Sequence, residues 1–123
     1  MFHGLNSHIG HGAHIAHVLA GHGIETVGFD HRGFGRSPGK AGRVASLEEH
    51  LADALRFVRM MKKEYEGVPM FALGLSMGGM TTYHLSLRDP TLFEGTILMA
   101  PALKNAVNGF LVGVTSALKK LLP

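Results

Sequence analysis

A serine lies between two glycines in the stretch 74–78, Gly-Leu-Ser-Met-Gly, which matches the pattern G-x-S-x-G. An apolar run at 70–73 precedes this stretch, and a segment of apolar and small residues follows at 79–87. The order predicts a strand, a tight turn and a helix, with Ser76 at the tip of the turn. There the hydroxyl would be exposed for nucleophilic attack, and the helix N-terminus would favour developing negative charge.

Gly74 and Gly78 are the predicted elbow glycines, because side chains two residues before and after the serine would collide with neighbouring backbone. The alternative interpretation is a glycine-rich turn with an incidental serine, since the chain contains seventeen glycines. The apolar run before the motif and the helix-like segment after it favour the nucleophile interpretation.

The segments before the elbow alternate between strand-like and helix-like patterns. Residues 1–2 resemble the end of a buried strand, residues 10–21 have helical spacing, and residues 24–30 are β-branched and aromatic, as in a strand. Ser46 and Glu49 form a capping box that begins the next helix, which Gly67 ends. That helix is predicted to bury one apolar stripe, which comprises Leu47, Leu51, Ala54, Leu55, Val58, Met61 and Tyr65.

The segments after the elbow continue the alternation. Pro90 ends the helix that follows the serine, and residues 95–100 are nearly all apolar, as in a strand covered on both faces. Strand, helix, strand, helix, strand, elbow, helix and strand together predict an α/β fold with a doubly wound, mainly parallel sheet.

Length and composition exclude several classes of protein. The 123 residues suit one domain, and 46% hydrophobic with 17% charged residues indicates a globular chain. A net charge of +3 without a long basic run argues against nucleic-acid binding. The absence of cysteine excludes disulfides and thiolate catalysis and fits a cytoplasmic location. Nothing in the sequence implies a cofactor.

Four histidines, at positions 8, 11, 14 and 17, recur every three residues around the first predicted helix. Each step of three turns the helix position by about 60°, so the four imidazoles spread over half the circumference. A solvated helical face is therefore favoured over a metal site, and no metal ligand is assigned.

The glycine-punctuated loop at 30–39 lies near Arg32, Arg36, Lys40 and Arg43, which could cradle a phosphate. The loop lacks the pattern G-x-x-x-x-G-K-[ST] and does not lead directly into a helix. A structural loop beside the serine is the favoured interpretation.

Residues 102–123 have the broad apolar stripe of an amphipathic helix. Two interpretations stand equally. The segment is either an ordinary helix that packs on another surface, or part of a lid over an acyl pocket that contacts a membrane peripherally.

Four motifs together resemble a known family. His3-Gly4, Asp-His-Arg-Gly-Phe-Gly-Arg-Ser at 30–37, Gly-Leu-Ser-Met-Gly-Gly at 74–79 and Leu-Met-Ala-Pro at 98–101 occur in this order. In order and spacing they resemble the monoacylglycerol lipase and lysophospholipase branch, or serine aminopeptidase-like branch, of the α/β-hydrolases. The resemblance implies a partial α/β-hydrolase core at 1–101 and the start of a helical cap at 102–123.

The resemblance also implies roles for individual residues. Ser76 would be the nucleophile that attacks an ester carbonyl, and the backbone N–H groups of Leu5 and Met77 would form the oxyanion hole. The substrate would be a lipid or small ester, such as a monoacylglycerol or lysophospholipid. Such an enzyme would form and then hydrolyse an acyl-enzyme.

The resemblance places the partner histidine and aspartate later in the chain than the serine. After Ser76 the sequence offers only His84 and Asp89. His84 lies eight residues along the same predicted helix, on the order of 12 Å from the serine, and Asp89 lies further. Neither can take the proton of Ser76, so we expect the chain alone to be inactive.

Three hypotheses follow. The chain is an incomplete portion of a serine hydrolase whose His–Asp pair lies elsewhere, or a non-catalytic fragment or degenerate homologue that binds a lipid or protein partner. A third, weaker hypothesis keeps the elbow but changes the chemistry to another acyl transfer or a peroxidase-like reaction. The strand that ends at Phe2 would lie in the middle of the sheet as a stub.

Overall fold

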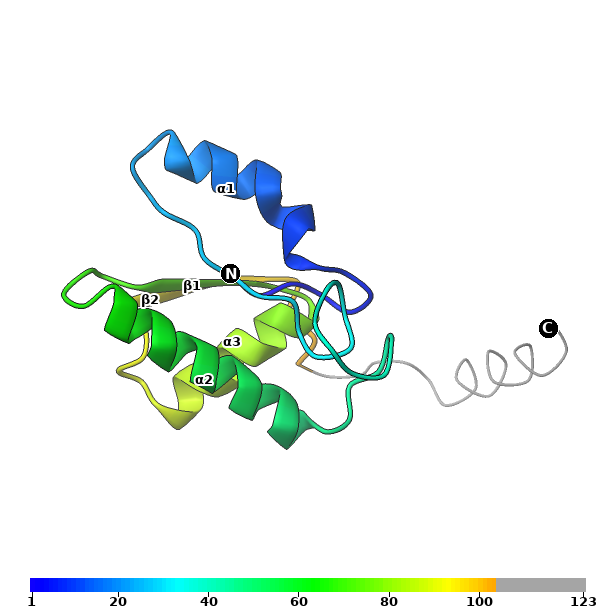
Figure 1. The fold of residues 1–123 in the computed structure, drawn as a ribbon. Coiled ribbons are helices and arrows are strands. Elements are labelled where there is room, and N and C mark those ends of the chain that lie inside the picture. The colour runs from blue at the N-terminus through cyan, green and yellow to red at the C-terminus, as the bar shows by residue number, and fades with distance from the viewer. Residues whose placement is uncertain (104–123) are drawn as a thin grey trace, which may run out of the picture.

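The computed structural model describes residues 1–103, and the predicted cap at 102–123 lies almost entirely outside the described residues. A 3₁₀ turn, η1 (Ile9–Gly12), leads into α1 (Ala13–Ala20), and then come α2 (Leu47–Glu64), β1 (Phe71–Leu75), α3 (Met77–Arg88) and β2 (Gly95–Met99). In Figure 1, α1 lies on one side of the two strands, and α2 and α3 lie on the other. This is the α/β arrangement that the alternating pattern predicts.

The sheet is parallel. β1 pairs with β2 in a register that places Phe71 opposite Gly95 and Leu75 opposite Met99. On the other edge of β1, the Phe2 N–H donates to the Leu73 carbonyl (2.8 Å) and the Phe2 carbonyl accepts from the Leu75 N–H (3.2 Å). Phe2 therefore occupies the place of a third parallel strand, which confirms the predicted stub next to β1.

The prediction of a strand at 24–30 is wrong, because within the described chain this segment forms neither a strand nor a helix. The Phe29 ring packs edge-on against Phe2 (ring centroids 6.3 Å apart), and the Met1 amino group donates a hydrogen bond to the Val27 carbonyl (2.7 Å). The N–H and C=O of Phe2 already bond to β1. Two residues therefore cannot also build a ladder towards 24–30, since a ladder needs repeated pairs.

The core lies between β1 and the two helices on one side of the sheet. Its buried residues come from the N-terminal segment, α2, β1, α3 and the loop after α3: Phe2, Leu51, Ala54, Val58, Ala72, Leu85 and Leu92. The expectation that β2 is covered on both faces is wrong for the described residues. Ile97 is 56% exposed, because only β1 and α3 make extensive contacts with β2.

The predicted capping residue begins α2. The Ser46 side chain accepts a hydrogen bond from the Glu49 N–H (3.1 Å). The apolar stripe differs from the prediction at its start, because Leu47 in the first turn is exposed while His50 is buried with Leu51 and Ala54. Residue 50 precedes 54 by four positions and therefore shares its face of the helix.

Replacing Ser46 by alanine is expected to lower the free energy of unfolding by about 1 kcal/mol, because the Glu49 N–H loses its acceptor. Chemical denaturation followed by circular dichroism measures the change. Ser46→Asp keeps an acceptor and serves as the matched control. Equal stability of the alanine and aspartate variants would contradict a capping role.

Candidate active site

Ser76 is the single residue between β1 and α3, as the motif predicts. Its backbone has φ +53° and ψ −112°, a conformation that residues other than glycine rarely adopt. The Ser76 N–H donates to the Met99 carbonyl (2.9 Å), and the Ser76 carbonyl accepts from the N–H groups of Met80 (3.0 Å) and Ala102 (3.1 Å). Three backbone hydrogen bonds thus hold the strained residue in place.

The two elbow glycines lie where backbone segments approach closely. A Cβ on Gly74 would collide with the carbonyl of Gly78, and a Cβ on Gly78 would collide with the carbonyl of Phe2. The first contact closes the turn between β1 and α3. The second lets α3 begin directly against the N-terminal segment.

Replacing Gly78 by alanine is expected to lower the free energy of unfolding by about 3 kcal/mol, because the new methyl group must displace backbone. Thermal and urea denaturation measure this loss. Gly21→Ala is a matched control, since Gly21 ends α1 with an ordinary helical φ of −61°. If both variants kept the parent stability, the close approach at Gly78 would be refuted.

The N-terminal segment brings Gly4 alongside the serine. A Cβ on Gly4 would lie 3.4 Å from the Ser76 Cβ and 3.5 Å from the Leu75 carbonyl oxygen, which is contact distance. Within residues 1–103, neither the Leu5 N–H nor the Met77 N–H donates to a backbone carbonyl. The segment carrying one predicted oxyanion donor therefore lies against the turn that carries the other.

No general base accompanies Ser76 among the described residues. Within residues 1–103 no side chain forms a hydrogen bond with the Ser76 Oγ, and the His84 ring lies beside Tyr83 on α3. The Asp89 carboxylate accepts from the N–H (3.0 Å) and hydroxyl (2.6 Å) of Thr91, and these hydrogen bonds lower its pKa. Asp89 thus caps the turn after α3 rather than orienting an imidazole.

Three histidines, His3, His31 and His50, are buried next to one another, and their burial was not predicted from the sequence. The rings of His3 and His31 have centroids 4.5 Å apart, and those of His31 and His50 are 4.3 Å apart. Burial lowers the pKa of all three, that of His31 to about 3. All three are therefore neutral at pH 7. Only His50 left a signal in the sequence, through its helical spacing from Ala54.

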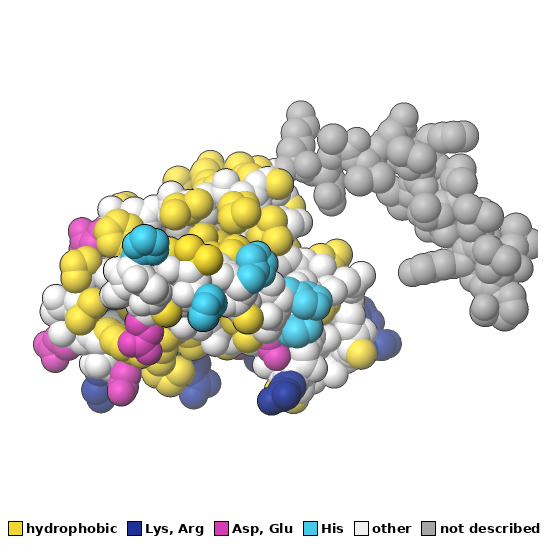
Figure 2. Space-filling view, turned by 90° about the horizontal axis from the view of Figure 1, so that it is seen from above, with side chains coloured by type: hydrophobic (Ala, Val, Ile, Leu, Met, Phe, Trp, Pro, Cys, Tyr) yellow, Lys and Arg dark blue, Asp and Glu magenta, His cyan; other side chains and the backbone are white. Residues whose placement is uncertain are grey.

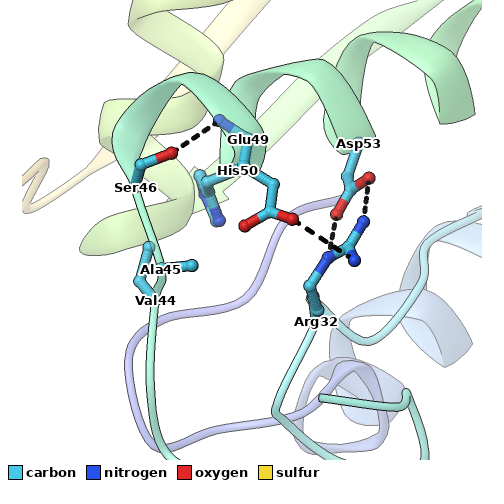
Figure 3. Close-up of a pocket in the computed structure, with 7 residues that line it drawn as sticks. All are labelled: Arg32, Val44, Ala45, Ser46, Glu49, His50 and Asp53. Carbon is cyan, nitrogen blue, oxygen red and sulfur yellow. Dashed lines mark hydrogen bonds and ion pairs between the residues drawn. The ribbon is translucent and has the colours of Figure 1, made fainter. Parts of the chain in front are cut away.

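The hydrogen bonds of the loop at 30–39 support its interpretation as a structural loop, which the sequence favours over a phosphate cradle. The Asp30 carboxylate accepts from the backbone N–H groups of Arg36 and Ile9 (both 2.8 Å), which lowers its pKa. Arg32 makes two 2.9 Å hydrogen bonds to Asp53. Figure 3 shows that this ion pair lines the pocket at the start of α2. Arg32 is thus already paired with carboxylates, which weakens the phosphate-cradle alternative.

The other histidines of the N-terminal region lie on the surface. Figure 2 shows several imidazoles among hydrophobic side chains on the face that carries α1. The rings of His8 and His11 are 3.9 Å apart, and the His11 Nδ1 lies 2.9 Å from the Ser7 hydroxyl. His14 and His17 are exposed on α1. Within residues 1–103, no three metal-binding side chains converge.

A membrane-crossing helix would have to be both long and apolar, and none of the helices within residues 1–103 meets both conditions.

Curated relatives resemble this chain over most of its length. Mouse monoglyceride lipase is 35% identical over 99 residues, which cover 80% of this chain and 33% of the relative. Monoacylglycerol lipase of Mycolicibacterium smegmatis is 32% identical over 123 residues, which cover 98% of this chain and 44% of the relative. The chain therefore spans less than half the length of these relatives.

A solved structure and a family profile agree with these relatives. The crystal structure of Paleococcus ferrophilus monoacylglycerol lipase matches with a TM-score of 0.75 and 29% identity, over 99% of this chain and 46% of that one. The profile described as Serine aminopeptidase, S33 matches residues 1–123. The motifs, the strand–turn–helix at Ser76 and these matches lead to one conclusion: the chain belongs to the serine aminopeptidase S33 family of α/β-hydrolases and is similar to the monoacylglycerol lipases within that fold.

Proposed function

We propose that this chain supplies the nucleophile and the oxyanion hole of a serine hydrolase that acts on carboxyl esters, with monoacylglycerols or lysophospholipids as substrates. The observation that carries the proposal is the conformation of Ser76. A serine at φ +53° between a parallel strand and a helix, held by three backbone hydrogen bonds, is strained in the way an exposed nucleophile requires.

The reaction would begin with attack of the Ser76 Oγ on the ester carbonyl while a base removes the hydroxyl proton. The oxyanion of the tetrahedral intermediate would accept hydrogen bonds from the N–H groups of Met77 and Leu5. The protonated base would then return its proton to the leaving oxygen as the intermediate collapses, which expels the alcohol and leaves an acyl group on Ser76. Water, deprotonated by the same base, would hydrolyse this acyl-enzyme and release the fatty acid. Each donor typically lowers the barrier by a few kcal/mol.

The base must come from outside the described residues. After Ser76 the sequence has only His84 and Asp89 of the required types, and neither contacts the serine. The chain spans 46% of the Paleococcus ferrophilus structure that it matches. A His–Asp pair on polypeptide corresponding to the remainder of that fold would complete the site.

One observation favours the alternative that the chain is a non-catalytic binder of a lipid or protein partner. Large apolar side chains of the sheet are exposed, among them Phe71 (64%) and Ile97 (56%). Apolar surface of this kind associates with other apolar groups. Peripheral membrane contact through residues 102–123, as part of a lid over an acyl pocket, remains a separate proposal that belongs to the hydrolase function.

A chimera tests the ester-hydrolase proposal. Residues 1–123 would replace the matching segment of Paleococcus ferrophilus monoacylglycerol lipase, whose remaining polypeptide would supply the missing strands. We expect release of fatty acid from a monoacylglycerol or a lysophosphatidylcholine, and none of the peptide-bond cleavage that an aminopeptidase would give. A chimera that folds cooperatively but hydrolyses neither lipid would refute the proposal and favour the non-catalytic alternative.

A further inference from the structure

A chain of hydrogen bonds runs from α2 to the first turn of α3. The His50 Nε2 lies 2.7 Å from the Thr81 Oγ1, and the Thr81 hydroxyl lies 2.9 Å from the Met77 carbonyl oxygen. Both His50 and Thr81 are buried. The reaction described above uses neither side chain.

The direction of this chain follows from the chemistry of its members. A carbonyl oxygen can only accept, so the one hydroxyl proton of Thr81 points to Met77. The Thr81 oxygen must then accept from His50, which fixes His50 as the neutral tautomer with its proton on Nε2. A threonine within a helix often bonds back one turn, but here a donor from a second helix fixes its hydroxyl rotor.

The bonded carbonyl belongs to the residue whose N–H is the proposed oxyanion donor. Two peptide units flank the Met77 Cα. The Ser76 carbonyl, in the same unit as the Met77 N–H, is held by Met80 and Ala102, and the Met77 carbonyl, in the next unit, is held by Thr81. Fixing both units fixes the direction of the Met77 N–H.

The other proposed donor is held in a related way. The His3 Nδ1 donates to the Gly4 carbonyl (2.8 Å), while its Nε2 accepts from the His31 N–H (2.9 Å). The Gly4 carbonyl and the Leu5 N–H belong to one planar peptide unit. The His31 ring lies between the rings of His3 and His50. The histidine bonded to the Gly4 carbonyl and the histidine bonded to Thr81 therefore belong to one row of buried rings.

We propose that His50, acting through Thr81, is a positioning residue that holds the Met77 N–H in the direction required to stabilise the oxyanion. This inference rests on the proposed function. Removing the Nε2 donor frees the Thr81 hydroxyl to rotate away from the Met77 carbonyl, so the peptide unit that follows Met77 is held less firmly. Because the oxyanion needs Met77 chiefly in the transition state, the loss appears in kcat and not in KM.

Variants of the ester-hydrolysing chimera test the positioning role. His50→Phe fills the space without a donor and is expected to lower kcat roughly tenfold with KM changed less than twofold. His50→Gln, whose amide can donate to Thr81, is expected to recover most of the loss. Thr81→Val should lose as much as His50→Phe, and the double variant no more than either.

The matched control is Thr82→Val, because the neighbouring Thr82 hydroxyl is equally buried but has no hydrogen-bond partner within residues 1–103. It should keep kcat within twofold. An unchanged kcat in His50→Phe, or no recovery in His50→Gln, would overturn the positioning role and leave the hydrolase proposal standing. An inactive parent chimera would instead overturn the hydrolase proposal.

A measurement on the 123-residue chain does not depend on catalysis. The His50 Nε2–H should give a slowly exchanging imidazole proton resonance in NMR spectra, which Thr81→Val removes and Thr82→Val retains. The Met77 and Gly78 amide resonances should move in His50→Phe and return in His50→Gln. Resonances that respond equally to Thr81→Val and Thr82→Val would overturn the hydrogen-bonded chain itself.

Discussion

Replacing Ser76 by alanine is expected to lower ester hydrolysis by the chimera by a factor on the order of 10⁴ to 10⁶, the usual loss when a serine nucleophile is removed. The methyl side chain of alanine has no oxygen to attack the carbonyl, so only the oxyanion donors and substrate binding remain. The measurement is kcat/KM for a monoacylglycerol, with mass spectrometry of the fluorophosphonate-treated protein to detect the serine adduct.

Ser86→Ala is the matched control for this loss. Ser86 lies ten residues further along α3, and its hydroxyl donates to the Thr82 carbonyl (2.9 Å) within the helix. Its removal should leave turnover within twofold and the adduct intact. Retained hydrolysis after Ser76→Ala, or an adduct that persists in that variant, would assign the chemistry to another residue.

The same probe distinguishes the chain from the completed site. No side chain within residues 1–103 accepts the Ser76 proton, so the 123-residue chain is expected to give no adduct while the chimera reacts. An adduct on the chain that Ser76→Ala abolishes would mean that the elbow alone activates the hydroxyl. The inactive-chain expectation would then be wrong.

The features that could be predicted from the sequence are local ones. The turn at Ser76, the cap at Ser46 and the helix end before Pro90 each depend on residues within about four positions of one another, and the structure has all three. Short-range steric contacts and hydrogen bonds determine such features, and these depend on the types of neighbouring residues in the sequence.

The features that could not be predicted depend on contacts between distant segments. Residues 24–30 have the composition of a strand, but composition does not show whether a partner strand has free backbone groups. The N–H and C=O of Phe2 both already bond to β1. His31 is 1% exposed because Phe2, His3, Phe29 and His50 surround its ring. No pattern within residues 30–37 indicates those neighbours, so the polar motif gave no sign of burial.

The burial of His31 is expected to make the protein sensitive to acid. Its pKa is about 3 in the folded state and about 6.5 in an unfolded chain, so the unfolded chain binds more protons between these values. The contribution of neutral His31 to the stability is therefore fully present above pH 6.5 and is lost as the pH falls towards 3. Each pH unit below 6.5 lowers the free energy of unfolding by about 1.4 kcal/mol, so at pH 4.5 the protonation of His31 alone lowers it by about 3 kcal/mol.

The neighbours of His31 increase this sensitivity. Burial also lowers the pKa of His3 and His50, and a charge on any of the three rings repels a charge on the next. Asp30 is the one carboxylate that partly offsets the effect at His31, and its own pKa is lowered. Because that pKa is lowered, Asp30 is still charged at pH 4.5. A domain stable by about 5 to 15 kcal/mol would lose a large part of that margin.

Urea denaturation between pH 7.5 and 4.5 measures the effect, with the slope of unfolding free energy against pH as the readout. In His31→Phe and His31→Gln, the new side chain cannot take up the proton. Both variants should therefore reduce the slope by the amount that corresponds to one bound proton, about 1.4 kcal/mol per pH unit, even if their stabilities at pH 7 differ. The phenyl ring joins the aromatic rings of Phe2 and Phe29, and the amide of Gln keeps a polar group at the site.

The control is His17→Gln on the exposed surface of α1, which should leave the slope unchanged. A parent chain whose stability is constant from pH 7.5 to 4.5 would mean that water or movement solvates His31. A slope that survives in both His31 variants would place the titrating group elsewhere. If the slope flattens in both His31 variants and stays unchanged in His17→Gln, His31 is the group whose protonation destabilises the fold in acid.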